Sequence, residues 1–139
     1  MTNFDQLYSP KVMEHFMHPK NIGVIKDASG VGTVGNPRCG DVMRVYIKVK
    51  IKNKTEEIIQ DIKVQTLGCG AAIATSSMAT QMVKGKPVDE ALKLSRQAIA
   101  DALGGLPPEK IHCSVLTADG IKKAIEDYRH KNSKFQILN

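Results

Sequence analysis

The sequence predicts an α+β domain, a two-layer fold in which helices pack on one face of an antiparallel three-stranded sheet. Three observations lead to this prediction. Apolar and polar residues alternate most regularly over Val42–Ile51, which is typical of a strand with one wet face. A polar turn follows at residues 53–55, and a second strand pattern covers Glu56–Leu67. The rest of the chain is dominated by helix-forming stretches, so strands come first and helices later.

Composition fits one soluble globular domain over residues 1–139 with a real core, since 42% of residues are hydrophobic and 24% charged. We expect residues 1–8 and 131–139 to be loose. The net charge is +6, but the basic residues are spread along the chain and aromatics make up only 4%, so a nucleic-acid partner is not expected.

No targeting or membrane-spanning segment is predicted. The N-terminus lacks the basic start and apolar run of a signal peptide. The uncharged stretch Val64–Val83 is long enough to span a bilayer, but it contains too many polar residues to do so. These features predict a cytoplasmic protein with no membrane partner, whose three cysteines stay reduced.

Turn and capping signals place the elements that precede the sheet's long hairpin. Ser9-Pro10 is typical of a helix start, and a short helix is expected over Lys11–Met17 with His15 and His18 on its surface. A short strand is expected around Val31–Val34. A shift in the alternation near residues 58–60 predicts a β-bulge in the returning strand.

Three helices are expected after the hairpin. The first covers Ala71–Val83 and ends at Gly85, and the second runs over residues 87–103 to Gly104-Gly105. A stiff extended link follows over Leu106–Lys110. The last helix is expected over residues 110–130, and its buried stripe comprises Ile111, Val115, Ala118, Ile121, Ile125 and Tyr128.

Cys39, Cys69 and Cys113 all lie beside turns or predicted helix starts. Cys69 stands between Gly68 and Gly70, where the backbone turns from strand to helix and a Cβ would be strained. The positive end of the following helix favours the thiolate form of this cysteine. The hairpin also returns Cys69 toward the end of the sheet where Cys39 lies.

Two further metal-binding side chains accompany the thiols. Asp41 follows Cys39 by two residues, so in an extended backbone both side chains point the same way. His112 directly precedes Cys113, and adjacent helix positions diverge by about 100°, so we do not expect both on one ion. Three sulfurs with one oxygen or nitrogen form a soft site suited to zinc or an iron–sulfur cluster. The ligands are single and far apart, so only the folded chain gathers them.

The segments around these cysteines are GNPRCGDVM (residues 35–43), LGCGAAIATSS (67–77) and LPPEKIHCS (106–114), and the chain opens with YSPKVMEHF (8–16). Together they resemble the IscU/NifU family of iron–sulfur scaffold proteins over nearly the whole chain. The chain is similar to the single-domain IscU type, because it lacks the insertion that SufU-type relatives carry between the second and third cysteines.

The resemblance implies a scaffold that receives sulfur from a cysteine desulfurase, assembles a [2Fe–2S] cluster with iron and passes it to apo acceptor proteins. Such a protein is a carrier and not a turnover enzyme. Asp41 matches the position at which the family's aspartate favours cluster release. We hypothesise that Cys113 accepts the persulfide sulfur, assisted by His112 and Lys110, with a pKa lowered by its surroundings. The implied cluster ligands are Cys39, Cys69 and Cys113, with Asp41 or His112 as the fourth.

Several alternatives stay open. The same pocket could hold zinc in a structural or regulatory domain. A thiol enzyme using Cys113 and His112 is disfavoured, since adjacent residues are badly placed for a nucleophile–base hydrogen bond. Glu109 replaces the valine of the family's Leu-Pro-Pro-Val-Lys segment, which argues against recognition by an Hsp70-type chaperone. A homo-oligomer is also left open.

Overall fold

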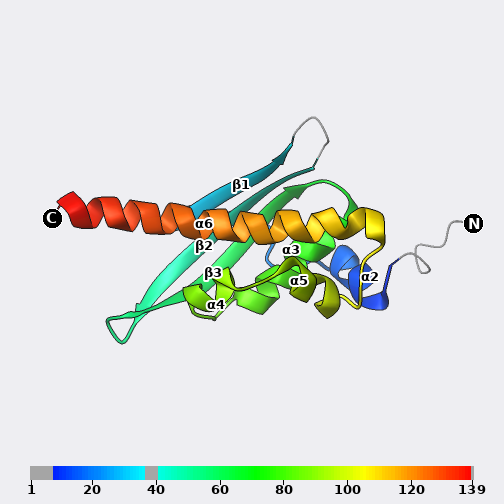
Figure 1. Ribbon diagram of the computed structural model, residues 1–139, viewed down its shortest axis with the longest axis horizontal. Coiled ribbons are helices and arrows are strands. Elements are labelled where there is room, and N and C mark those ends of the chain that lie inside the picture. The colour runs from blue at the N-terminus through cyan, green and yellow to red at the C-terminus, as the bar shows by residue number, and fades with distance from the viewer. Residues whose placement is uncertain (1–7, 37–40, 139) are drawn as a thin grey trace, which may run out of the picture.

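The computed structural model describes residues 8–36 and 41–138, with the side chains of Asn36, Glu109 and 132–138 outside the description. The predicted α+β architecture is confirmed: helices pack on a three-stranded antiparallel sheet, and α6 lies along it (Figure 1). The strands, in the spatial order β1-β2-β3, are β1 (Gly30–Asn36), β2 (Asp41–Lys52) and β3 (Glu56–Leu67). The helices are α2 (Pro10–Met17), α3 (Gly70–Val83), α4 (Val88–Leu92), α5 (Arg96–Ala102), the 3₁₀ turn η2 (Pro108–Lys110) and α6 (Ile111–Leu138).

The β2–β3 hairpin has the predicted turn and the predicted bulge. Asn53 and Lys54 adopt left-handed φ angles of 54° and 69°. The register shifts between the Lys48–Asp61 and Val49–Ile59 pairs, so Gln60 is the extra residue. The hairpin therefore brings the end of β3 back beside the start of β2, where Asp41 lies.

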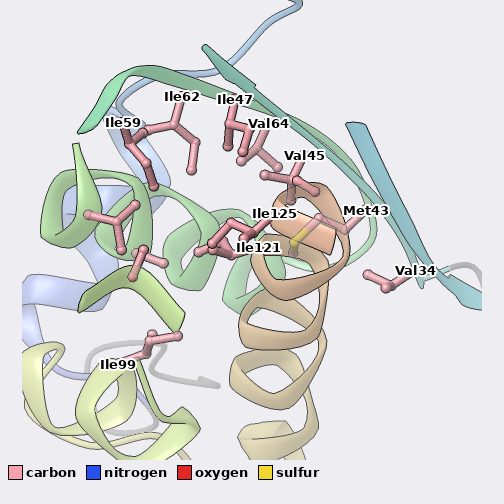
Figure 2. Packing of buried hydrophobic residues seen from close by; sticks show 14 of the residues in the cluster. Val34, Met43, Val45, Ile47, Ile59, Ile62, Val64, Ile99, Ile121 and Ile125 are labelled. Carbon is pink, nitrogen blue, oxygen red and sulfur yellow. The ribbon is translucent and has the colours of Figure 1, made fainter. Parts of the chain in front are cut away.

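The core lies between the sheet and the helices that cover it, with buried residues from α3, α4, α5 and α6 (Figure 2). The inward-facing residues Met43, Val45 and Ile47 of β2 are fully buried, as the alternation predicted. Ile121 and Ile125 point toward them from α6. The buried stripe of α6 differs from the predicted one at the start of the helix. Ile111 is exposed, and the buried positions of the first turns are Cys113, Ser114 and Thr117.

Glycines let α6 pack directly on the edge strand β1. A Cβ on Gly32 would lie 2.5 Å from the backbone nitrogen of Ala124, a distance that only a backbone shift could relieve. The amide of Val31 donates to the Asp127 carboxylate, with 2.9 Å between N and Oδ2. These contacts fix the position of α6 on the sheet, and with it the position of Cys113 at the helix start.

Three predicted boundaries are wrong. The expected helix over 87–103 is two helices, because Ser95 caps a new start at α5 by accepting the amide of Ala98 at 3.0 Å. Residues 108–110 of the expected extended link form a 3₁₀ turn. The last helix does not loosen after His130 but continues to Leu138. Residues 1–7 and Asn139, also expected to be loose, lie outside the described residues.

The expectation that His15 lies on the surface is also wrong. The His15 side chain is buried between α2 and α3, with its Nδ1 2.7 Å from the Ser77 hydroxyl, whereas His18 is exposed as expected. A single-sequence pattern could not reveal this, because the partner is 62 positions away. No helix of the described residues is long and apolar enough to cross a bilayer.

Candidate metal centre

Two of the three predicted thiols meet at the N-terminal ends of two helices. Cys69 is the N-cap of α3, and Cys113 lies in the first turn of α6. Their sulfur atoms are 3.7 Å apart. Two thiolates bound to one tetrahedral ion at about 2.3 Å lie about 3.8 Å apart, so this spacing fits shared coordination of one metal ion.

The surroundings of Cys69 favour the thiolate form of its side chain. Burial by itself raises the pKa of this thiol, but the amide groups of Ala72 and Ala71, the Cys113 thiol and the ammonium of Lys110 outweigh it. The pKa of Cys69 therefore lies below its ordinary value. The charge of the Cys69 thiolate is in turn the largest cause that raises the pKa of Lys110.

Cys113 differs from what the sequence predicted. Only 1% of its surface is exposed, because it packs against Ala71 and Ala72 of α3. Burial, followed by the negative charge of Cys69, raises the pKa of Cys113 to about 12. The expected lowering of this pKa is thus not found, because desolvation and the negative charge of Cys69 outweigh the lowering effect of the Lys110 ammonium.

The side chains of Asp41 and His112 lie close to the two sulfurs. The Nε2 atom of His112 is 3.7 Å from the Cys113 sulfur and 3.4 Å from Oδ2 of Asp41. The expectation that these two adjacent residues do not bind the same ion stays a prediction, although the far nitrogen of the imidazole reaches back toward the Cys113 sulfur. Two candidate fourth ligands therefore lie together beside Cys113.

The glycines around Cys69 are required for space. Neither Gly68 nor Gly70 is among the glycines with a positive φ. A Cβ on Gly68 would lie 2.8 Å from Oδ1 of Asp41, and one on Gly70 would lie 3.0 Å from the ring of Phe16. The predicted reason, a strained backbone, is wrong. The absence of a side chain at Gly68 leaves room for the Asp41 carboxylate beside Cys69.

A cavity of about 300 Å³ opens beside Cys69. Its walls are mostly apolar and come in part from α2, and Lys110 adds a positive charge. The thiolate-forming Cys69 is therefore reachable through a pocket that can take an apolar group. The lining residues are Tyr8, Val12, Met13, Phe16, Cys69, Gly70 and Lys110.

Cys39, the third predicted ligand, lies outside the described residues. Among the residues that the structure describes, no three Cys, His, Asp or Glu side chains converge as a preformed metal site. The sequence also held no clear signal for Thr75 and Thr117, two fully buried hydroxyl residues behind Cys113. Their burial follows from the packing of α3 on α6.

The fold and this thiol pair define a class of protein: the chain belongs to the NifU-like N-terminal domain family, whose model matches residues 7–135. Within that family it is similar to scaffold proteins of the IscU type. Iron-sulfur cluster assembly scaffold protein IscU 1 of Archaeoglobus fulgidus is 61% identical over 132 residues, which cover 95% of this chain and 83% of the relative. The IscU scaffold protein of Azotobacter vinelandii is 50% identical over 128 residues, 89% of this chain and 95% of the relative.

Solved structures share the fold. The crystal structure of a NifU-like protein (N-terminal) from Brucella abortus matches with a TM-score of 0.67, covering 91% of this chain and 97% of the other. At 23% identity this match supports the fold alone.

Proposed function

We propose that this protein is a scaffold on which a [2Fe–2S] cluster is assembled and from which it is passed to apo acceptor proteins. The observation that carries the proposal is the 3.7 Å spacing of the Cys69 and Cys113 sulfurs at two helix starts. Asp41 and His112 stand beside them as candidate fourth ligands. Cys39 is the proposed third sulfur ligand, on its sequence motif alone.

Sulfur is proposed to arrive as a persulfide on a cysteine desulfurase. A scaffold thiolate attacks the terminal sulfur of that persulfide, a new S–S bond forms on the scaffold, and the desulfurase cysteine leaves as a thiolate. We keep Cys113 as the proposed acceptor, with His112 and Lys110 assisting. The protein carries the sulfur and the cluster without being a turnover enzyme.

The raised pKa of Cys113 suggests an order of events. In the metal-free protein this thiol is largely protonated at neutral pH, because its pKa is about 12. A bound cation favours the thiolate of its ligands. We therefore propose that iron binds first, through the Asp41 carboxylate and through Cys69, the cysteine with the lower pKa. Cys113 then becomes nucleophilic.

Zinc in the same site is the second candidate, because the thiol and imidazole ligands suit zinc equally. In that case the protein would be a zinc-stabilised structural or regulatory domain. The reducing cytoplasm stays the predicted compartment, since free thiols stay reduced there. Recognition by an Hsp70-type chaperone is not part of the proposal, because the motif departs at Glu109.

The test is anaerobic reconstitution with ferrous iron, cysteine and a cysteine desulfurase, followed by transfer to an apo-ferredoxin. The wild-type chain is expected to develop the visible absorption of a [2Fe–2S] cluster and to activate the ferredoxin. Cys69→Ser and Cys113→Ser should lose both signals. Ser114→Ala is the matched control, because within the described part of the chain this buried hydroxyl bonds the Ile111 carbonyl and no sulfur ligand. A wild-type protein that takes up zinc but neither assembles nor transfers a cluster would favour the structural alternative.

A further inference from the structure

Two threonine hydroxyls meet in the interior directly behind the candidate metal centre. Thr75 of α3 and Thr117 of α6 are both 0% exposed. Their Oγ1 atoms are 3.0 Å apart, which makes a hydrogen bond across the contact between the two helices. Polar groups in such a place are costly unless they are bonded, so a purely apolar pair would fill the space more simply.

Both hydroxyls also reach the backbone of the cysteine-bearing turns. Thr117 Oγ1 is 2.9 Å from the Cys113 carbonyl oxygen, and Thr75 Oγ1 is 3.4 Å from the same atom. Thr75 further lies 3.0 Å from the carbonyl oxygen of Ala72. Each hydroxyl has one hydrogen to donate: when Thr117 donates to Thr75, Thr75 in turn donates to the carbonyl of Ala72 or of Cys113.

This hydroxyl bridge joins the two helix starts on which the thiols stand. Ala72 belongs to the first turn of α3, whose amides stabilise the Cys69 thiolate, and the Cys113 carbonyl belongs to the first turn of α6. The distance between the two sulfurs depends on how these two turns are placed relative to each other. Besides the contact between the two sulfurs, this bridge is a side-chain hydrogen-bond link between α3 and α6.

We propose that Thr75 and Thr117 are positioning residues, whose hydroxyl bridge holds the starts of α3 and α6 so that the Cys69 and Cys113 sulfurs keep the spacing of metal ligands. The inference rests on the proposed function, because it assumes that the two thiols bind one metal ion. It assigns to the pair a role in metal affinity and ligand geometry beyond its part in the stability of the fold.

Cobalt(II) titration of the anaerobic protein tests this, because thiolate-to-cobalt charge-transfer bands report the sulfur ligands. Thr75→Val and Thr117→Val keep the side-chain shape and remove the hydroxyl. Each is expected to raise the cobalt dissociation constant about tenfold and to shift the charge-transfer bands, as other changes around metal ligands do. Thr75→Ser and Thr117→Ser keep the hydroxyl and should behave as wild type.

Thr80→Val is the matched control. Thr80 is equally buried on α3, but its hydroxyl bonds Ser77 and Asn21 on the side of α2, away from the thiols. We expect it to lower the melting temperature without changing cobalt affinity.

The double variant Thr75→Val/Thr117→Val tests whether the two hydroxyls act as one bridge. In each single variant the remaining hydroxyl keeps a backbone carbonyl partner, so the melting temperature of the double variant should lie close to those of the single variants. Its cobalt affinity should stay as weak as in the single variants, because the bridge is still missing.

Unchanged cobalt affinity and bands in both valine variants would overturn the inference, and so would an equal weakening in Thr80→Val. Recovery of wild-type cobalt affinity in the double variant would also contradict it. If wild type binds cobalt through thiolates but assembles no cluster, the proposed function fails while the positioning role is still decided by the variants. A wild-type protein without thiolate–cobalt bands would overturn both.

Discussion

At the scale of single residues, Cys69 and Cys113 lie within 3.7 Å of each other and yet have opposite acidities. Helix amides and Lys110 surround the partly exposed Cys69, and its pKa is lowered although burial acts in the other direction. Cys113 is buried against alanines, and desolvation raises its pKa to about 12. The protein therefore places a thiol that ionises more readily than an ordinary cysteine beside one that stays protonated at neutral pH.

This difference predicts which cysteine reacts first. In the metal-free protein at pH 7–8, iodoacetamide should modify Cys69 faster than Cys113 by at least about tenfold, because the thiolate is the nucleophile. Peptide-resolved mass spectrometry follows both sites in one sample. Unfolding in urea should abolish the difference and serves as the control. Faster modification of Cys113 in the folded protein would contradict the pKa order.

We predict that Asp41 shortens the lifetime of a bound cluster. Its carboxylate contacts His112 and fills the space that Gly68 leaves open beside Cys69. A hard oxygen ligand holds iron less firmly than a thiolate, so Asp41→Ala should slow cluster transfer to apo-ferredoxin by about tenfold. The cluster's visible circular dichroism measures this rate. Asp27→Ala removes the same charge at an exposed site paired with Lys48 and should leave the rate unchanged. A shorter-lived cluster in Asp41→Ala would show that the aspartate holds the cluster and does not release it.

At the scale of secondary-structure elements, α2 is attached to α3 by polar contacts. The Ser77 hydroxyl accepts the Lys20 amide at 2.8 Å and can donate to Nδ1 of neutral His15. Asn21 donates to the Thr80 hydroxyl at 3.0 Å. This attachment matters for the site, because α2 supplies Val12, Met13 and Phe16 to the wall of the cavity beside Cys69.

The buried contact between His15 and Ser77 predicts that the stability of the fold depends on pH. Burial, only partly offset by Glu14, lowers the pKa of His15 from its usual 6.5, so the folded state disfavours the imidazolium. Stability from neutral His15 is complete above pH 6.5 and is lost as the pH falls toward the lower folded-state pKa. We expect the free energy of unfolding to fall by at most about 1.4 kcal/mol per pH unit from this group. Urea unfolding at pH 7.5 to 5 (roughly the range over which a histidine titrates) measures it.

His15→Gln should flatten this pH dependence, and His18→Gln, at an exposed position of the same segment, should leave it as in wild type. An equal effect of both substitutions would assign the pH dependence to other groups.

At the scale of the whole molecule, the candidate site exists only where three elements come together. Asp41 starts β2, Cys69 caps α3, and His112 and Cys113 begin α6. The helix α6 is held in place by Gly32 and Asp127 at the edge strand, far along the helix from the cysteine. Metal binding should therefore depend on whether the entire chain is folded.

This coupling predicts that metal stabilises the folded chain. Zinc at a free concentration 100-fold above its dissociation constant should add about 2.7 kcal/mol to the free energy of unfolding. Thermal unfolding with and without zinc measures the gain. Cys69→Ala/Cys113→Ala should remove it, whereas zinc stabilisation that persists in this double variant would mean that zinc binds elsewhere.

The sequence by itself determined the fold class, the two long strands, a bulge near residues 58–60 and the helix start at Ser9, because these follow from local alternation and capping. It also predicted that Cys69 and Cys113 belong to one site. The sequence did not show that the helix of 87–103 breaks at Ser95, because its capping signal lay inside a helix-compatible stretch.

Only the tertiary structure decided the properties that depend on distant neighbours. The burial of His15 comes from Ser77. The high pKa of Cys113 comes from α3 packing against the start of α6, and the close approach of His112 and Asp41 comes from the sheet register. Desolvation and side-chain contacts between distant segments are set by packing, and residue type and spacing along one chain do not specify them.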